Sequence, residues 1–328
     1  MLEVIDLHTD LLLRGGTVRA VDGVSMRVDA GETLGVVGES GCGKSMLALS
    51  ILRLVPTPPA KITGGRIMFK GKDLLALNDA EMRKIRGADI SMIFQEPMTS
   101  LNPVVTIGRQ LAEAVRLHQH LSRRDAADKT VEMLRLVRMP EAERRVHDYP
   151  HHMSGGMRQR VMIAMALSCN PKVILADEPT TALDVTIQAQ LLDLMGQLQE
   201  KLGTAMVLIT HDMGLIAENA DRVMVMYAGM KVEEAEVNEL FANPLHPYTR
   251  GLLGSIPHLE LGSGADSGRK RLQEIEGNVP SLQNLPAGCA FAARCPHATA
   301  QCRELVPPLE QWSPGHWAAC WHAAAGAA

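Results

Sequence analysis

A loop suited to binding phosphate lies near the start of the chain. Residues 38–45 read Gly-Glu-Ser-Gly-Cys-Gly-Lys-Ser and match the pattern G-x-x-x-x-G-K-[ST] at every fixed position. In such a loop, backbone N–H groups surround phosphate oxygens, the lysine reaches the β- and γ-phosphates, and the last serine binds Mg²⁺. The sequence therefore predicts a site for ATP and Mg²⁺. The residues expected to form it are Gly38, Ser40, Gly41, Cys42, Gly43, Lys44 and Ser45.

The segments on both sides of this loop have the character that the pattern requires. Thr33–Val37 is short, apolar and strand-like, and Ser45–Leu54 is typical of a helix. The N-terminus of such a helix carries a positive dipole end that favours bound phosphate. A glycine-rich turn with an incidental lysine is the alternative, and the strand–loop–helix context disfavours it.

A pair of carboxylates follows another apolar run much later in the chain. Val173–Ala176 has the composition of a buried parallel strand, and Asp177 and Glu178 stand at its expected carboxyl end. We expect Asp177 to hold Mg²⁺ through water and Glu178 to orient or deprotonate the attacking water. A solvated loop is the alternative, but an apolar strand that leads directly into the pair disfavours it.

Three further polar sites complete an ordered series. Gln95 follows the strand-like run Ile90–Phe94, and His211 follows the strand-like run Ala205–Ile209. Ser154-Gly155-Gly156 precedes a helical segment. Ser154 can cap that helix, and a helix N-terminus binds anions. For the Ser-Gly-Gly sequence an ordinary loop is the alternative, and for His211 a structural role is the alternative. The five motifs in this order predict a pair of ATP-binding lobes that close over nucleotide and reopen after hydrolysis.

This series of motifs resembles that of the ATP-binding-cassette family over roughly residues 1–235. The resemblance implies that Ser154, Gly155 and Gly156 belong to the signature motif and contact the γ-phosphate of ATP held by a partner subunit. Met157 stands where the family often has Gln.

The same resemblance assigns roles to the remaining polar residues. It implies that Gln95 senses Mg²⁺ and the attacking water and couples to membrane subunits, and that His211 is a switch that contacts the γ-phosphate. Residues 182–184, Ala-Leu-Asp, would cross the dimer interface, with helix capping by Asp184 as the alternative. Together with Glu178, Gln95 and His211 are the expected catalytic residues. The residues expected at Mg²⁺ are Ser45, Gln95 and Asp177.

One position departs from the family pattern. The family usually stacks adenine on an aromatic residue near the N-terminus, whereas this chain has Leu11-Leu12-Leu13-Arg14 there. We expect adenine to pack on aliphatic groups or on Arg14 instead.

The pattern of strand-like and helical runs predicts an α/β fold. These runs alternate from Leu34 to Tyr227, as in a parallel sheet. Over about residues 97–155 the runs are helical, with amphipathic Ile107–Leu117 and Arg124–Val137, and a further helix is expected at Val185–Leu202. Together with the resemblance, this predicts a P-loop NTPase (RecA-like) core with an inserted helical subdomain.

Composition narrows the class of protein. A chain of 328 residues favours two domains, and a net charge of −4 gives no sign of a surface for nucleic acid. No apolar run approaches the roughly 20 residues of a membrane span. The first residues lack the basic and apolar regions of a secretory signal, so we expect a cytoplasmic location.

The character of the sequence changes after residue 235. His246-Pro247-Tyr248-Thr249 is followed by Gly/Ser-rich Leu261–Gly268 and then by a tail rich in proline and cysteine. This pattern resembles the C-terminal extension of peptide and nickel importer ATPases. We expect a nucleotide-binding domain over residues 1–235 and a small Cys-rich extension over residues 236–328.

The tail holds four of the six cysteines: Cys289, Cys295, Cys302 and Cys320. In a reducing compartment such a cluster favours metal over disulfides, and thiolates suit Zn²⁺ or an iron–sulfur cluster. Because no C-x₂-C pair is present, we favour a [4Fe–4S] cluster over Zn²⁺. Four cysteines packed as small hydrophobic side chains are the third possibility. We expect the metal to stabilise the tail and to be separable from ATP chemistry.

These features predict an ATPase subunit that powers import of di- or oligopeptides from the cytoplasmic side of the inner membrane, bound there peripherally. The resemblance implies as partners a second, different ABC ATPase chain, two transmembrane permease subunits and an external substrate-binding protein, with no nucleic acid. A nickel importer of the same architecture is the alternative. A soluble ABC ATPase without a transport role fits less well, because neither a second cassette nor a long coiled-coil insert is visible in the sequence.

Overall fold

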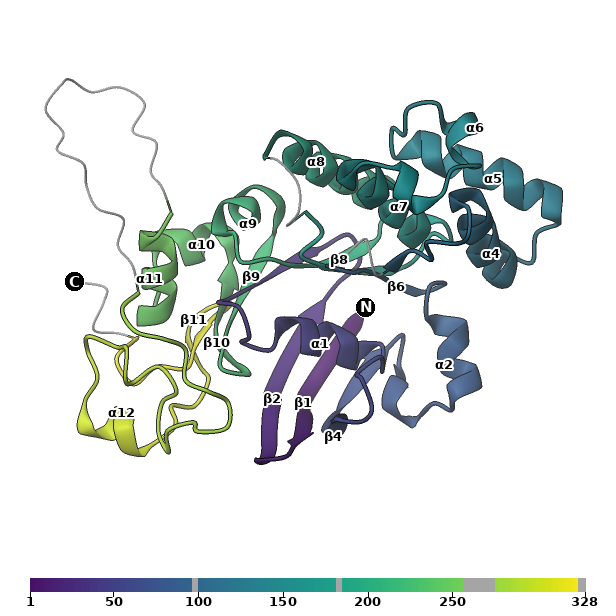
Figure 1. Cartoon of the computed structure of the whole chain (residues 1–328). Coiled ribbons are helices and arrows are strands. Elements are labelled where there is room, and N and C mark those ends of the chain that lie inside the picture. The colour runs from purple at the N-terminus through teal and green to yellow at the C-terminus, as the bar shows by residue number, and fades with distance from the viewer. Residues whose placement is uncertain (96–99, 181–184, 257–274, 324–328) are drawn as a thin grey trace, which may run out of the picture.

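Two β-sheets organise the chain (Figure 1). The structure is a computed structural model and describes residues 1–95, 100–180, 185–256 and 275–323. The smaller sheet is antiparallel, with the strand order β2-β1-β4-β5. Its strands are β1 Leu2–Leu13, β2 Gly16–Val28, β4 Ala60–Phe69 and β5 Lys72–Asp73.

The larger sheet is mixed and has the strand order β11-β12-β10-β9-β3-β8-β7-β6. Pairing is parallel from β9 to β6 and antiparallel on the other side. Its strands are β3 Thr33–Val37, β6 Ile90–Ile93, β7 Val173–Asp177, β8 Ala205–Ile209, β9 Arg222–Tyr227, β10 Met230–Glu236, β11 Glu310–Ser313 and β12 His316–Ala318. The strands predicted at Thr33–Val37 and Ala205–Ile209 are confirmed with the same bounds.

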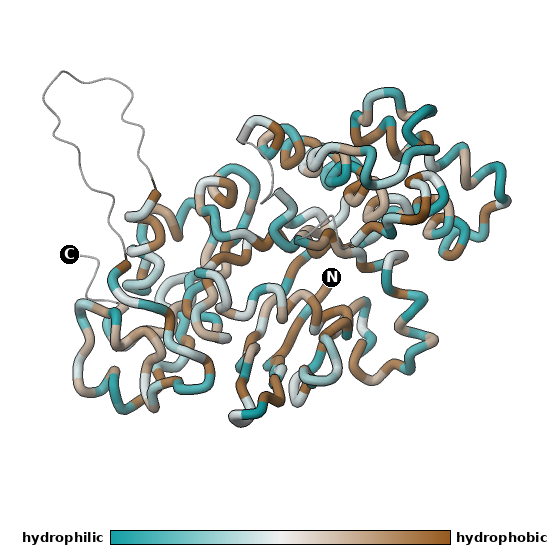
Figure 2. The backbone as a smooth tube through the Cα atoms, in the orientation of Figure 1, coloured by the Kyte–Doolittle hydropathy of each residue, from teal (hydrophilic) through white to brown (hydrophobic). Residues whose placement is uncertain are grey.

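Apolar side chains fill the space between the two sheets and the helix that follows the phosphate loop. This helix, α1 Lys44–Ile51, buries Leu47 and Ile51 in a cluster shared by both sheets. Hydrophobic residues accordingly concentrate along the strands in Figure 2. Two short elements, η1 Leu74–Ala76 and α2 Asp79–Ile85, then lead to β6.

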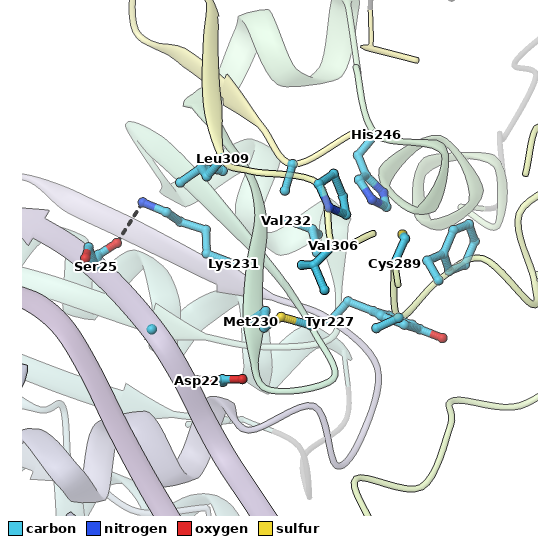
Figure 3. A pocket seen from close by; sticks show the side chains of 15 residues that line it. Asp22, Ser25, Tyr227, Met230, Lys231, Val232, His246, Cys289, Val306 and Leu309 are labelled. Carbon is cyan, nitrogen blue, oxygen red and sulfur yellow. Dashed lines mark hydrogen bonds between the residues drawn. The ribbon is translucent and has the colours of Figure 1, made fainter. Parts of the chain in front are cut away.

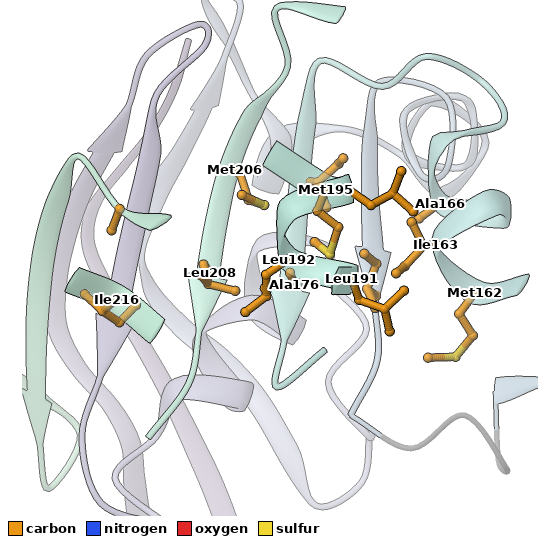
Figure 4. Close-up of a cluster of buried hydrophobic side chains, with 14 of the residues drawn as sticks. Met162, Ile163, Ala166, Ala176, Leu191, Leu192, Met195, Met206, Leu208 and Ile216 are labelled. Atoms are coloured by element: carbon orange, nitrogen blue, oxygen red, sulfur yellow. The ribbon is translucent and has the colours of Figure 1, made fainter. Parts of the chain in front are cut away.

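Three helices pack on the larger sheet through a second apolar cluster (Figure 4). They are α7 Gly155–Leu167, α8 Val185–Leu202 and α9 Met213–Asn219. The bounds of α8 are those predicted from the apolar period of the sequence. Met206 and Leu208 of β8 pack in this cluster with Met195 of α8. The cluster thereby holds the helices against the strands whose ends carry the polar residues.

A group of helices lies between β6 and α7 and forms one side of the molecule (Figure 1). Its elements are α4 Ile107–Gln119, α5 Arg123–Leu136, α6 Ala142–Arg145 and η2 Pro150–His152. Buried Leu111, Met133 and Leu134 join α4 and α5 to the core cluster. The described residues of this region contain no named strand, which agrees with the helical character that the sequence predicts.

The C-terminal region continues the larger sheet. After α10 Val237–Ala242, α11 Pro247–Gly254 and α12 Ala300–Glu304, strand β12 pairs with β10. Glu233 and His316 join these strands through a buried ion pair of 2.8 Å. The expected boundary after residue 235 therefore falls inside β10, a strand whose partner comes from the tail.

In the described part of the chain, no helix has the length and apolar character needed to cross a membrane.

Candidate nucleotide-binding site

The polar residues singled out by sequence gather at one edge of the larger sheet. β3, β8, β7 and β6 are neighbouring parallel strands, so their carboxyl ends meet at the same edge. Gly38 follows β3, His211 follows β8, Asp177 and Glu178 lie at the end of β7, and Gln95 follows β6. In parallel sheets this edge is where ligands bind.

The phosphate loop needs glycine at two positions for steric reasons. Gly38 has φ 153° and Gly43 has φ 101°, both in the region that favours glycine. A Cβ atom at Gly38 would clash with the carbonyl oxygen of Met226, and one at Gly43 with that of Ala20. The backbone can approach these strands closely only because neither residue has a side chain.

Lys44 is a buried cation held by its own loop. Lys44 is only 5% exposed to solvent. Its Nζ donates hydrogen bonds to the carbonyl oxygens of Gly38 at 2.6 Å and Glu39 at 3.0 Å. The Sγ atom of Cys42 lies 3.7 Å from the same nitrogen. Among the described residues, no carboxylate forms an ion pair with Lys44. A buried cation without an anionic partner favours the binding of an anion such as phosphate.

A hydroxyl and a carboxylate stand beside this loop in the arrangement expected for Mg²⁺. Ser45 Oγ donates to Asp177 Oδ1 at 3.0 Å. Burial raises the pKa of Asp177, while the hydrogen bond from Ser45 opposes that shift. A divalent cation would favour the charged carboxylate at this position. Oxygen ligands of this kind suit Mg²⁺.

Two side chains converge on the carboxylate of Glu178. Gln95 Nε2 donates to Glu178 Oε2 at 3.0 Å, and His211 Nδ1 lies 3.2 Å from Glu178 Oε1. The backbone of Glu178 has φ 45°, which is uncommon for a residue with a side chain and often marks a functional position. Its N–H donates to the carbonyl oxygen of Ile209 at 2.9 Å, which ties the end of β7 to β8.

The Ser-Gly-Gly sequence begins helix α7, as predicted. Ser154 is the N-cap, and its Oγ accepts a hydrogen bond from the N–H of Met157 at 3.4 Å. Ser154 and Gly155 are exposed. Gln159, one turn further on, donates to the carbonyl oxygen of Pro179 and so connects this helix to the segment after Glu178. The Ala-Leu-Asp sequence at residues 182–184 lies outside the described residues.

The stretch expected near adenine is open to solvent. Leu12 and Leu13 end strand β1 with exposed side chains, and Arg14 is exposed beside them. Packing of adenine on these groups stays a prediction.

The four tail cysteines line one small cavity together with His322. The N–H of Cys289 donates to the carbonyl oxygen of Cys302 at 2.8 Å, which holds two of the cysteine segments together. Burial raises the pKa of the Cys289 and Cys295 thiols and raises the pKa of Cys320 to about 11. The raised pKa values favour the protonated form of these three thiols.

Metal binding at these cysteines stays a prediction. Across the described ranges, no three His, Cys, Asp or Glu side chains are arranged so that they could hold a metal ion. The donor set fits a metal centre by its chemistry, since four thiols from separate segments share a cavity.

The sequence motifs did not indicate some of the residues that contact the phosphate loop. Glu39 is a position that the loop pattern leaves free, yet its carboxylate pairs with Arg294 of the tail and its N–H donates to the hydroxyl of Tyr248. Tyr248 belongs to the His-Pro-Tyr-Thr sequence, which served only to characterise the tail. The only hint in the sequence was that Glu39, a charged residue, occupies a variable position of the loop pattern. His322, which lines the cysteine cavity, was not singled out either.

Comparison with protein families gives two matches along the chain. Residues 21–181 match the ABC transporter family, and residues 232–302 match the C-terminal region of oligopeptide/dipeptide transporters. The fold and the site therefore define an ATP-binding cassette with an additional C-terminal region.

Individual proteins resemble the chain over nearly its whole length. It is 56% identical to a probable peptide ABC transporter ATP-binding protein, y4tR, of Sinorhizobium fredii, with 98% of this chain and 94% of that protein covered. It is 52% identical to the dipeptide transport ATP-binding protein DppD of Bacillus subtilis, with the same coverage. The dimeric, post-hydrolysis structure of the cassette MJ0796 bound to ADP and Pi is 28% identical, with a TM-score of 0.66 over 72% of this chain and 99% of that one.

The chain belongs to the ABC transporter family, as an ATP-binding protein of the dipeptide/oligopeptide type. The resemblance inferred from the motifs is thereby confirmed, and so are the α/β cassette fold and the additional C-terminal region.

Proposed function

We propose that this chain is the ATP-hydrolysing subunit of an importer for di- or oligopeptides. The convergence of Gln95 and His211 on the Glu178 carboxylate carries the proposal. It brings together a base, an amide and an imidazole at the sheet edge where Lys44 and Ser45 stand ready for phosphate and Mg²⁺. Peptide relatives that match both the cassette and the tail support the substrate class.

The chemistry of hydrolysis follows from these positions. Lys44 would bind the β- and γ-phosphates, while Ser45 and Asp177 would hold Mg²⁺, which would offset the negative charge of the phosphates. Glu178 accepts a proton from the attacking water or orients it. Gln95 and His211 hold the Glu178 carboxylate, and both can respond to the γ-phosphate. Gln95 also serves as the Mg²⁺-sensing residue.

We assign Ser154, Gly155 and Gly156 to the ATP held by a second cassette, for which a different chain is expected. Their exposure at the start of α7 supports this assignment, because an anion-binding helix end is open to another surface. The nucleotide-binding domain then spans residues 1–235, with its helical subdomain at about 97–155, and residues 236–328 form the extension.

A groove beside the Gln95 segment suits a permease contact. Leu54 after α1, Phe94 after β6, His118 of α4 and Met165 of α7 are among the residues that line it. Phe94 and Leu54 are exposed although they are large and apolar. A permease segment in this groove would lie next to Gln95 and would sense closure of the lobes. The chain would then sit peripherally on the cytoplasmic face of the inner membrane, and an external binding protein would deliver substrate.

Uptake into proteoliposomes that contain the assembled transporter tests this function. Labelled dipeptide should enter when ATP and the external binding protein are both supplied, and Lys44→Ala in this chain should abolish entry. The same vesicles should not accumulate Ni²⁺. Entry of Ni²⁺ without entry of peptide would instead favour the nickel importer.

We also propose that Cys289, Cys295, Cys302 and Cys320 hold a [4Fe–4S] cluster, with Zn²⁺ as the alternative. The shared cavity of the four thiols supports a common centre. A bound metal would favour the thiolate forms that burial opposes at Cys289, Cys295 and Cys320. Its binding energy would stabilise a region with little apolar core of its own.

Metal analysis of anaerobically purified protein decides between these centres. A cluster predicts about four irons and four sulfides per chain, and Cys302→Ser should remove them. Cys169→Ser is the matched control, because Cys169 lies outside the cavity. One zinc per chain would favour the structural alternative. A metal-free protein with a folded tail would exclude both centres.

A further inference from the structure

The buried side chain of Arg294 joins the C-terminal extension to the phosphate loop. Arg294 Nη1 donates to Glu39 Oε2 at 2.6 Å, and Nη2 donates to Oε1 at 3.0 Å. The Arg294 side chain is only 4% exposed. A bidentate arginine–carboxylate pair of this kind fixes orientation as well as distance.

The remaining donors of the guanidinium are satisfied as well. Nε donates to the carbonyl oxygen of Glu276 at 3.0 Å, Nη2 to that of Ile275 at 3.1 Å, and Nη1 to Tyr227 Oη at 3.4 Å. All five N–H groups of Arg294 thus have acceptors. The guanidinium plane is set by the tail and by β9, and it presents a fixed fork to Glu39.

Tyr248 provides a second connection to the same loop residue. Its hydroxyl accepts a hydrogen bond from the N–H of Glu39 at 2.7 Å. The Tyr248 ring packs against Tyr227 with centroids 4.6 Å apart and against Phe291 with centroids 5.5 Å apart. Figure 3 shows Tyr227 and Cys289 near each other where the β9–β10 hairpin meets the tail. The tyrosine is therefore held in place by aromatic side chains from the core and the extension.

Glu39 passes this restraint on to the phosphate-binding lysine. Its carboxylate is held by Arg294, its N–H by Tyr248, and its carbonyl oxygen accepts from Lys44 Nζ at 3.0 Å. A shift of the Glu39 peptide would therefore move one of the two carbonyls that position the ammonium. Arg294 directly precedes Cys295, so the segment that carries this contact also carries a residue of the cysteine cavity.

We propose that Arg294 and Tyr248 are positioning residues for ATP, so that the C-terminal extension sets the nucleotide affinity of the phosphate loop. This inference rests on the proposed function, in which the loop binds MgATP. It differs from a purely structural anchor, which would attach the tail to the core without changing how the loop binds phosphate.

Titration of the full-length chain with MgATP tests the inference. Arg294→Gln should weaken binding at least about fivefold, while Arg303→Gln, a matched change of an exposed tail arginine, should leave it unchanged. Glu39→Gln combined with Arg294→Gln should weaken binding by less than the product of the single effects, because both changes break one contact. In the assembled transporter, the KM for ATP should rise more than kcat falls.

A milder variant keeps the test decisive if Arg294→Gln fails to fold. Tyr248→Phe retains the ring and removes only the acceptor for the Glu39 N–H, and it should weaken MgATP binding at least about twofold. Tyr149→Phe, at an exposed tyrosine of the helical region, is its control. If folded Arg294→Gln and Tyr248→Phe proteins bind MgATP with wild-type affinity, the inference is wrong while the proposed function stands. Absence of MgATP binding by the wild-type chain would instead overturn the proposed function.

Discussion

The two helix N-termini that this cassette can offer to phosphate are held in opposite ways. Helix α1 begins at buried Lys44, whose ammonium is bonded within its own loop, although Ser40 and Gly41 of that loop are exposed. Helix α7 begins at Gly155 after its N-cap Ser154, and both residues are exposed to solvent. We call the first end the enclosed end because its lysine is buried within its own chain, and the second the open end because its first residues face solvent. This contrast supports a site that two cassettes complete together.

The contacts that hold the two helix ends differ in how far apart their residues lie in the sequence. The loop before α1 is held by Arg294, 255 residues away in sequence. Helix α7 is held by nearer residues, since Arg158 donates to the carbonyl oxygen of Pro150 and Arg160 to that of Val137. The enclosed end is therefore sensitive to distant parts of the chain, and the open end depends on its own lobe.

The largest effect is expected at the enclosed end. Glu178→Gln should retain ATP binding, because Lys44 and Ser45 are untouched, and should lower the ATPase turnover of the complex by about 10²-fold or more. The altered complex should also accumulate with ATP in a closed dimer. Turnover within about threefold of wild type, well short of that general-base range, would remove Glu178 from the role of base.

The open end should separate binding from turnover. Ser154→Arg places a bulky cation where the other cassette's nucleotide is expected. It should lower the ATPase activity of the complex by about 10²-fold or more, the usual scale for losing a charge-stabilising contact. MgATP affinity of the isolated chain should stay near wild type. Ser122→Arg is the control, since Ser122 is also an exposed N-cap, at helix α5. An equal loss of affinity in the isolated chain would contradict a site shared between chains.

A smaller, pH-dependent effect is expected where the tail joins the sheet. Burial lowers the pKa of His316, but the hydrogen bond and charge of Glu233, helped by Glu239, outweigh it and raise that pKa overall. A raised folded-state pKa stabilises the protein below the unfolded value, and this stabilisation is lost as pH rises through the folded value. Nearby His246, whose pKa burial lowers to about 4, stays neutral in this range.

Thermal unfolding measures this effect. The melting temperature should fall as pH is raised from about 6 to about 8, across and above the ordinary histidine pKa of about 6.5. His316→Gln should flatten the fall and lower the melting temperature at the acidic end. His151→Gln, at an exposed histidine, should preserve the slope. An unchanged slope in His316→Gln would show that this pair does not set the pH response.

Sequence was a reliable guide where structure follows from local pattern. β3, β8 and α8 have the predicted bounds because their apolar runs or apolar period are uninterrupted and flanked by polar residues. The motifs meet at one sheet edge because each follows a parallel strand. The cap at Ser154 was predicted from residue type and position, and it is present.

Pairing between distant segments could not be predicted in the same way. Strands β1 and β2 precede the alternation that begins at Leu34, and β4 lies within it yet pairs with β1 in a separate antiparallel sheet. No local signal matches β12 to β10. The contact between Arg294 and Glu39, which joins the extension to the phosphate loop, has no local signal either. Such pairs depend on which surfaces meet after folding, and one sequence does not encode that as a local period.

The pairing of β12 with β10 has a consequence during synthesis of the chain. An unpaired strand edge is a template for pairing with other chains, and here β12 covers the edge of β10. Roughly eighty residues separate the two strands, so at about 5–20 residues per second the ribosome needs about 4–16 s to supply the cover. A nascent cassette therefore passes through an interval in which β10 is open to aggregation, and chaperone demand should be greatest then.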